Sequence, residues 1–224
     1  MTSARDDIIA TMRRSLGVSG RELPRRQIVA DRLARAPKGV IPERGHLKGE
    51  ALLEMFTRQA ELALATVTTV SSATDVPGAI ATYLRDHNLP ATIRMGDDPR
   101  LASMPWKETA LAITEGVSAG SDLNAVSHAF GGVAETGTLA MVSGHENPST
   151  LNFLPDNHIV VLDAKDITAD YETMWTKVRA AFGKGEMPRT VNWITGPSRS
   201  ADIEQTLLLG AHGPRRLHIV VVKG

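Results

Sequence analysis

Glu135 stands among small residues in the stretch 131–138, and two hydroxyl groups around a glycine follow it. A carboxylate flanked by apolar residues must find hydrogen-bond partners if it is buried, or face an open site that a ligand fills. The stretch therefore marks Glu135 as a candidate base or nucleophile, and Thr136, Gly137 and Thr138 as candidate ligand contacts. Thr136 and Gly137 also fit a tight turn between two strands, and Glu135 would then be a solvated residue at a hairpin tip.

The segment 195–200 offers a second candidate site. Gly196 and the hydroxyls of Ser198 and Ser200 follow an expected strand and precede an expected helix, an arrangement that binds phosphate or carboxylate groups. Arg199 adds a guanidinium group with a planar fork of donors. We therefore predict a monocarboxylate or phosphate site here, although Ser198 or Ser200 could instead only cap the helix. The Gly-Lys-Ser/Thr ending of a P-loop is missing.

A third loop begins where an expected strand ends at Glu115. Gly116 and Gly120 follow it, and glycines permit positive φ and a close approach of backbone N–H groups to an anion. We therefore include Glu115 and Gly116 in the predicted anion site. The alternative is a plain turn followed by a helix that Ser121 or Asp122 caps.

Histidines supply the candidates for acid–base work near neutral pH, and these are His128, His145, His158 and His212. We predict catalytic roles for His145, in a loop after a strand, and for His212, shortly before the last strand. Each could instead be a loop histidine whose hydrogen bonds are made within the protein. His158, which opens a strand, is expected to be structural. No histidine spacing indicates a metal site, so none is predicted, although His145 and Glu146 could meet a metal with a distant partner.

Helical and β-strand patterns alternate along the body of the chain. They predict helices at 48–64, 76–85, 166–182 and 200–209, and strands at 66–70, 91–95, 110–114, 137–143, 158–162, 191–195 and 217–222. The runs 159–162 and 219–222 are continuously apolar, as strands covered on both faces require. The sequence thus predicts an α/β fold, a three-layer sandwich with a mostly parallel, Rossmann-like sheet. Because ligands of such sheets bind outside the carboxyl ends of the strands, we expect the three loops to form one common binding site there.

A basic arm precedes this domain. Residues 1–45 hold 10 Lys and Arg against 5 Asp and Glu, a net charge of +5, and the remainder carries −5. The pattern predicts a helix at 6–16 followed by an irregular connector rich in glycine and proline. With 224 residues, against roughly 150 for a typical domain, we expect this arm, 1–45, and one α/β domain, 46–224. Apolar side chains interrupt the arm's charges, which favours docking on its own body or on a neighbouring subunit over nucleic acid.

Composition excludes several classes of site. The chain has no cysteine, which excludes disulfides, catalytic thiols and thiolate-held zinc or iron–sulfur clusters within it. Aromatic residues make up 4%, too few for a base-stacking surface. No apolar run approaches the roughly 20 residues of a membrane helix, and Asp6 and Asp7 stand where a signal peptide would be apolar. We therefore expect a cytoplasmic protein that has no membrane span and binds no nucleic acid.

Four segments form a recognisable set: 135–138 (Glu-Thr-Gly-Thr) before an apolar strand, 154–161, 196–204 and 210–218. Together they resemble the LUD (lactate-utilization) domain family over residues 45–224. In lacking cysteines, the chain is similar to the shorter members of that family. The resemblance implies a fold like that of phosphosugar isomerases and CoA transferases. It also implies a role in oxidising L-lactate to pyruvate with iron–sulfur partner proteins. A glutamate is the nucleophile in related CoA transferases, and Glu135 or Glu115 would be its counterpart, although neither lies in a full CoA-transferase motif.

The leading hypothesis is a non-redox subunit of a lactate-oxidising system that binds a small anionic metabolite at the three loops. It has no cofactor of its own, and the iron–sulfur clusters reside on partner subunits. The sequence leaves open whether the chain is itself catalytic and whether it forms a homo-oligomer. One rival is a stand-alone enzyme for a phosphorylated or CoA-linked metabolite, with Glu135 as base or nucleophile and Arg199 holding the anion. Another is an assembly or regulatory protein whose basic arm binds its partners.

Overall fold

The computed structural model describes residues 3–183, 185–201 and 207–224, and the chain divides into two compact units, Met1–Val40 and Ile41–Gly224. The N-terminal unit consists of two helices, α1 (Ala4–Ser15) and α2 (Leu23–Arg35). Ser3 caps α1, because its side chain accepts a hydrogen bond from the Asp6 N–H. The helix predicted at 6–16 is therefore confirmed.

Helix α2 occupies part of the segment that was expected to be an irregular connector, so that expectation is wrong there. Pro24 lies in the first turn of α2, where the missing N–H of a proline costs no intrahelical hydrogen bond. The helix ends at Arg35, after which Ala36 adopts a left-handed conformation. A proline that suggests a loop can thus also mark the start of a helix.

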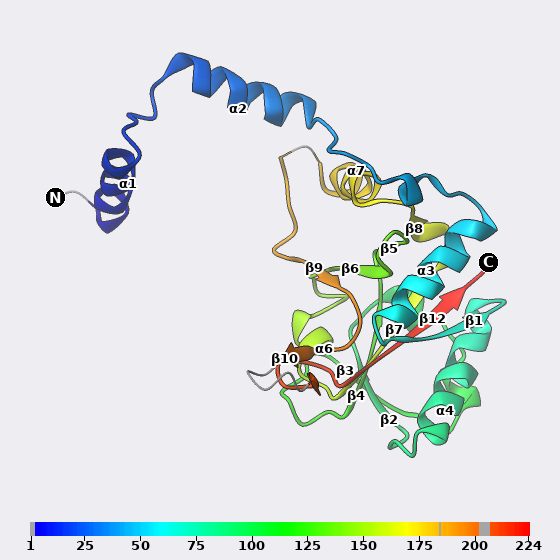
Figure 1. Ribbon diagram of the computed structural model, residues 1–224. Helices are drawn as coiled ribbons and strands as arrows, with labels where there is room; N and C mark the ends of the chain where they lie inside the picture. The colour runs from blue at the N-terminus through cyan, green and yellow to red at the C-terminus, as the bar shows by residue number, and fades with distance from the viewer. Residues whose placement is uncertain (1–2, 184, 202–206) are drawn as a thin grey trace. The chain divides into compact units, whose positions relative to one another are not determined.

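A six-stranded, entirely parallel sheet forms the centre of the C-terminal unit (Figure 1), in the order β1-β12-β7-β4-β2-β3. Its strands are β1 (Thr66–Val70), β2 (Thr92–Met95), β3 (Ala112–Glu115), β4 (Asn124–His128), β7 (Asn157–Asp163) and β12 (Arg216–Val222). The two continuously apolar runs are β7 and β12, and they lie side by side inside the sheet. The predicted α/β class and parallel sheet are confirmed.

Helices cover both faces of this sheet. They are α3 (Glu50–Leu62), α4 (Val76–Asp86), α5 (Pro99–Ala102), α6 (Ser149–Phe153) and α7 (Tyr171–Phe182), with 3₁₀ turns at Glu43–His46, Ala73–Asp75, Trp106–Glu108 and Ala164–Asp166. Ile159 of β7 shares a core with Ile80 of α4, whereas the next residue, Val160, shares the opposite core with Phe56 of α3. Among the described residues, no helix is long and apolar enough to cross a lipid bilayer.

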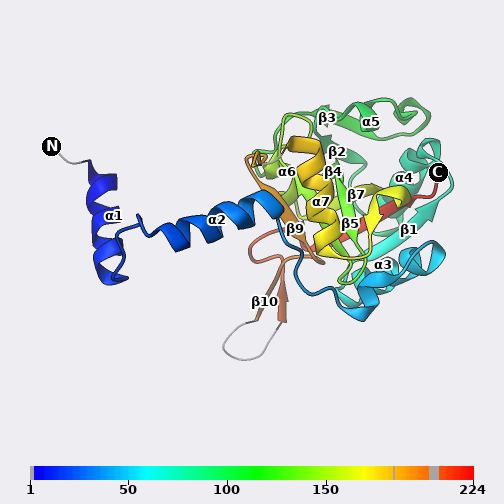
Figure 2. The ribbon, with the colours of Figure 1, turned by 90° about the horizontal axis from the view of Figure 1, so that it is seen from above.

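A second, four-stranded sheet packs on the α3 face, in the order β8-β5-β6-β9. Its strands are β5 (Gly131–Val133), β6 (Thr138–Val142), β8 (Ile167–Thr168) and β9 (Val191–Ile194). The strands predicted at 137–143 and 191–195 therefore exist, but outside the central sheet, because β6 folds back antiparallel to β5 and β9 pairs antiparallel with β6. Met174 of α7 packs against Val133 and Ala140, so α7 covers this sheet (Figure 2).

The helix predicted at 166–182 begins only at Tyr171, because β8 takes the preceding residues and Asp170 caps α7. The helix predicted at 200–209 is wrong. Its described residues form a hairpin of β10 (Arg199–Ala201) and β11 (Leu207–Leu209), and residues 202–206 lie outside the described part of the chain. A hydrogen bond from the Gly210 N–H to the Ser198 carbonyl closes the hairpin at its base.

Candidate functional site

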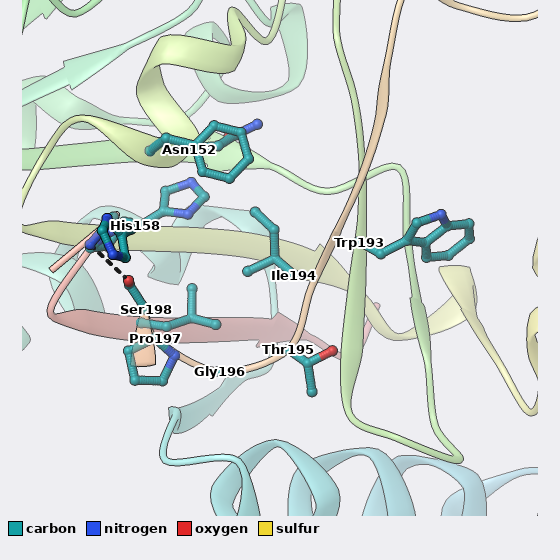
Figure 3. A pocket seen from close by; sticks show the side chains of 13 residues that line it. Asn152, His158, Trp193, Ile194, Thr195, Gly196, Pro197 and Ser198 are labelled. Carbon is teal, nitrogen blue, oxygen red and sulfur yellow. Dashed lines mark hydrogen bonds between the residues drawn. The ribbon is translucent and has the colours of Figure 1, made fainter. Parts of the chain in front are cut away.

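A cavity of about 230 Å³ opens between the end of β9, helix α6 and the starts of β7 and β12 (Figure 3). The described residues that line it are Asn152, Phe153, His158, Trp193, Ile194, Thr195, Gly196, Pro197, Ser198, His212, Gly213, Pro214 and Leu217. We call it the amino-edge pocket, because His158 and Leu217 are the second residues of the parallel strands β7 and β12. A site was expected at the carboxyl ends of the strands, and this pocket lies at the opposite edge of the sheet.

The segments that carry the family resemblance meet at this pocket, although they are far apart in the chain. One contributes His158, a second contributes residues 196–198, and a third contributes His212 and its neighbours. The fourth reaches the lining through a 2.6 Å hydrogen bond between the hydroxyls of Thr138 and Thr195. A concave pocket on which polar groups from distant segments converge is the best candidate for a binding site.

Gly196 fixes the course of the chain along the pocket. Its φ is +70°, and a Cβ at this position would clash with the carbonyl oxygen of Ala63, just beyond the end of α3. Only glycine combines this left-handed conformation with such a close approach of two backbones. The close packing on Ala63 therefore places Pro197 and Ser198 at the pocket wall.

Buried hydrogen bonds support the other wall. Nε2 of His158 lies 3.1 Å from Oγ of Ser127, and the Ser127 hydroxyl donates to Oδ1 of Asn152 at 3.4 Å. All three residues are buried. Burial lowers the pKa of His158 to about 3, so its ring is neutral near pH 7.

Two polar atoms in this wall have no partner among the described residues. They are Nδ1 of His158 and Nδ2 of Asn152. Leaving a buried polar atom unpaired costs about 1–3 kcal/mol, so such atoms are usually satisfied by water or by a ligand. Figure 3 shows Asn152 and His158 on one side of the pocket and Gly196 and Pro197 on the other. Both atoms are almost fully shielded from solvent and both residues line the pocket, so a polar group that reaches them from the pocket would satisfy them.

The opposite wall ends at Ser198 and His212. The His212 backbone N–H donates to the Ser198 hydroxyl oxygen at 3.3 Å, and the His212 residue is exposed. Among the described residues, none is found that accepts the Ser198 hydroxyl proton. The described lining holds two histidines but no Lys, Arg, Asp or Glu. It therefore suits a small molecule with at most one charge, whose charged end stays near the mouth.

Glu135, a predicted catalytic residue, contacts the N-terminus of α7. Its carboxylate accepts a hydrogen bond of 3.2 Å from the Tyr171 N–H, and the residue is 6% exposed. The turn predicted at Thr136 and Gly137 joins β5 to β6 as expected, but Glu135 is not a solvated tip. It does not line the amino-edge pocket among the described residues, so its visible contacts are those of a helix cap.

The predicted ligand contacts beside Glu135 reach the pocket indirectly. The Tyr171 hydroxyl donates to Thr138 at 2.9 Å, and the hydroxyls of Thr136 and Thr138 lie 2.7 Å apart. Thr138 in turn bonds Thr195, which lines the pocket. Gly137, with φ of +64°, lets this turn pack on the backbone of α3. The Glu-Thr-Gly-Thr segment thus positions the pocket wall.

Replacing Glu135 with alanine is expected to lower the free energy of unfolding by about 1–3 kcal/mol, because the buried N–H of Tyr171 loses its acceptor. Glu135→Gln retains an acceptor oxygen and is expected to lose less than about 1 kcal/mol, the charge–dipole contribution. Urea unfolding of both variants tests this. Equal losses in the two variants would show that the carboxylate charge, and not the hydrogen bond, carries the interaction.

The remaining predicted residues do not lie at one common binding site, so the prediction that the three loops meet is wrong. Glu115 ends β3 at the carboxyl edge and is exposed, and Gly116, which follows it, is half-buried. His145 is also exposed, with Nδ1 3.4 Å from Oδ2 of Asp97, which lies just beyond the end of β2. Only part of the predicted set lies at the amino-edge pocket, namely Gly196, Ser198 and His212.

The helix N-terminus predicted after Gly196 is wrong, because β10 follows instead of a helix. Arg199 and Ser200 lie on this strand, and Arg199 is exposed. The helix cap expected at Ser121 or Asp122 is likewise absent from the described residues. Asp122 instead accepts hydrogen bonds from Arg94 and Ser118, and β4 begins two residues later.

His128 lies at the carboxyl end of β4, inside a paired cluster. Its Nε2 is 3.7 Å from Oδ2 of Asp163, and Asp98 nearby holds Arg100 in a two-pronged ion pair. Burial, followed by the charge of Arg100, lowers the pKa of His128. The contact of His128 with Asp163 joins the carboxyl ends of β4 and β7, and Asp163 also pairs with Lys165 at 3.7 Å.

Sequence reasoning missed Ser127, Asn152 and Trp193 and expected His158 to be only structural. Ser127 lies on β4, a strand whose mixture of polar and apolar residues gave no clear period. One signal was available: Asn157 and His158 are polar residues at the start of an otherwise apolar, buried strand. Polar side chains at such positions need partners or a ligand.

Comparison with known proteins bears on the four segments of the resemblance. Residues 124–222 match the model of the LUD domain, and this range includes all four segments of the resemblance. Over this range the chain is similar to the LUD domain. The resemblance predicted from those segments is confirmed, and the strands from β4 to β12, with the pocket residues between them, fall inside the matched range of the LUD domain.

Proteins similar to this chain include several named lactate utilization protein C. One from Geobacillus thermodenitrificans is 30% identical over 144 residues, covering 56% of this chain and 60% of that protein. Another, from Geobacillus sp. WCH70, is 36% identical over 91 residues, covering 40% and 38%. The chain thus matches at most 60% of the length of these two relatives.

A crystal structure of a DUF162 family protein from Deinococcus radiodurans has the same fold. Its TM-score is 0.60 at 24% identity, and the match covers 79% of this chain and 99% of the other. At this identity the likeness concerns the fold alone.

Proposed function

We propose that this chain is a non-redox subunit of a cytoplasmic system that oxidises L-lactate to pyruvate. It binds a small monocarboxylate in the amino-edge pocket, and iron–sulfur clusters on partner subunits carry the electrons. The chain's own residues bind and orient the molecule and shield its inner end from water. The chain has no cysteine with which to hold such a cluster by thiolates.

One observation carries this proposal: the segments that define the LUD resemblance meet around a single small pocket that has unpaired polar atoms in its wall. A cavity of about 230 Å³ is suited to a molecule of a few heavy atoms and is small for a nucleotide or a CoA group. The names of the relatives add lactate utilization as the setting.

The rival enzyme for a phosphorylated or CoA-linked metabolite gains no support from the described residues. Its proposed nucleophile, Glu135, accepts a hydrogen bond from the start of α7. Its anion clamp, Arg199, is exposed and lies on a strand, not at a helix N-terminus.

Deleting the gene in its host is expected to abolish growth on L-lactate and to spare growth on pyruvate, which is already the product. Growth rates on the two carbon sources measure this. Undiminished growth of the deletion strain on L-lactate would contradict the proposed role.

Complementation tests the pocket itself. Gly213→Val adds a branched side chain beside Ser198, where a Cβ would already lie 3.3 Å from the Ser198 Cβ, and is expected not to restore growth on L-lactate. Gly144→Val is the matched control, because a Cβ there meets nothing within 4 Å, and it is expected to restore growth. Both variants are compared at equal soluble protein levels. Restoration by Gly213→Val would show that the pocket is not required.

A further inference from the structure

The hydrogen bonds behind the pocket determine which ring nitrogen of His158 carries the proton. The Ser127 hydroxyl donates its only proton to Oδ1 of Asn152, which can only accept. With that proton directed at Asn152, the Ser127 oxygen is left to accept from His158, an arrangement that favours the ring tautomer protonated at Nε2. Nδ1 is left as a bare acceptor, and it is one of the two unpartnered atoms of the wall.

The second unpartnered atom is a donor. Nδ2 of Asn152 carries two N–H groups, and its amide oxygen is already taken by Ser127. The wall therefore offers one acceptor, His158 Nδ1, and one donor, Asn152 Nδ2. A hydroxyl group, which donates one hydrogen bond and accepts others, satisfies both atoms, whereas a ketone oxygen can only accept.

We propose that the amino-edge pocket distinguishes 2-hydroxy acids from 2-oxo acids, with His158 and Asn152 as the residues that determine the specificity. This inference rests on the proposed function and names the ligand class of the same site. The hydroxyl at C2 donates to His158 Nδ1 and accepts from Asn152 Nδ2. A 2-oxo acid brings an oxygen lone pair against the lone pair of His158 Nδ1 and leaves that nitrogen unsatisfied.

The carboxylate of such a molecule fits the other end of the pocket. Ser198 retains a hydroxyl proton to donate, and the exposed His212 lies at the mouth. The charged group therefore remains near solvent, where its desolvation costs least. The enclosed end takes the hydroxyl, whose hydrogen bonds replace those it made to water.

Calorimetric titration of the full chain with L-lactate and with pyruvate tests the inference. L-lactate is expected to bind about 10- to 100-fold more tightly, the ratio expected when a buried acceptor loses its partner. Equal affinities, or tighter binding of pyruvate, would overturn the inference and leave the proposed function intact. Absence of binding of either acid would overturn both.

Ser127→Ala tests the role of the proton position, because Ser127 positions His158 and does not line the pocket among the described residues. Without the Ser127 oxygen, the ring is free to carry its proton on Nδ1, which can then donate to a ketone. The preference for L-lactate is expected to fall to about threefold or less, mainly through tighter binding of pyruvate. An unchanged preference for L-lactate would contradict the proposal that Ser127 sets the proton position on His158.

Nitrogen NMR of the histidine rings gives a readout independent of binding. In the wild-type chain His158 is expected to be neutral and protonated at Nε2, and in Ser127→Ala the Nδ1-protonated form is expected to appear. Thermal unfolding of both proteins checks that the variant is folded. A wild-type His158 that carries its proton on Nδ1 would overturn the inference, whatever the affinities.

Discussion

The free energy of unfolding is expected to fall steeply as the pH drops from about 6.5 towards 4, because two buried histidines are neutral in the folded state. Burial lowers the pKa of His158 from 6.5 to about 3 and that of His218 from 6.5 to about 4. His218 is stacked on Tyr83 and bonded to Thr66, and its Nε2 has no partner among the described residues. Both rings are therefore held away from water, which disfavours their charged form.

The direction of the effect follows from proton counting. Between pH 6.5 and 4 the unfolded chain binds a proton on each of these histidines and the folded chain does not, so stability is lost as the pH falls. Each histidine contributes a slope approaching about 1.4 kcal/mol per pH unit, so the pair approaches about 2.7 kcal/mol per unit. Above pH 6.5 this contribution is fully present. Urea unfolding at a series of pH values measures the slope.

A substitution tests whether the buried histidines cause this pH dependence of stability. His218→Gln is expected to reduce the acid slope by about one proton. Stability that is flat between pH 6.5 and 4.5 would contradict the burial of neutral rings.

Replacing Gly137 with alanine is expected to lower the free energy of unfolding by about 3 kcal/mol and to weaken ligand binding. The φ of Gly137 is +64°, and an added Cβ would clash with the backbone of Gln59 and Ala60 in α3. Relief of the clash must move the β5–β6 turn away from α3. Because Thr138 in this turn holds Thr195 at the pocket, the pocket wall is expected to move as well.

Gly116→Ala is the matched control for this prediction. Its φ of +110° is also positive, but an added Cβ would meet nothing within 4 Å, so only the backbone strain of about 1 kcal/mol is expected. Denaturant unfolding and L-lactate titration of both variants provide the comparison. If the two substitutions cost the same, close packing of the turn on α3 is not what requires glycine at position 137.

Five of the six strands of the central sheet could be predicted from the sequence, because the pattern that specifies each of them is local; β4 was missed. The apolar runs in β7 and β12 and the helical spacing in α3 and α4 each specify an element without reference to the rest of the chain. The helix predicted at 200–209 failed for the opposite reason. Leucines 207–209 fit a helix as well as a strand. Their pairing with residues 199–201 depends on the tertiary structure, which the local sequence pattern does not reveal.

The candidate site could be predicted only in part. Gly196, Ser198 and His212 were recognised as residues with chemistry, but their meeting with His158 depends on the order of strands in the sheet. The rule that ligands bind at carboxyl ends brought Glu115 and Glu135 into the same expected site, and neither lines the pocket among the described residues. The partners of Ser127 lie on α6 and β7, 25 and 31 residues further along the chain, so no local pattern reveals them.

The most direct test of the account is amide chemical-shift mapping of the isotopically labelled chain during titration with L-lactate. We predict the largest shifts at Gly196, Ser198, Gly213 and Leu217, which line the amino-edge pocket. Shifts concentrated at Gly96 and Gly116, at the carboxyl ends of β2 and β3, would place the ligand at the other edge of the sheet and contradict the account.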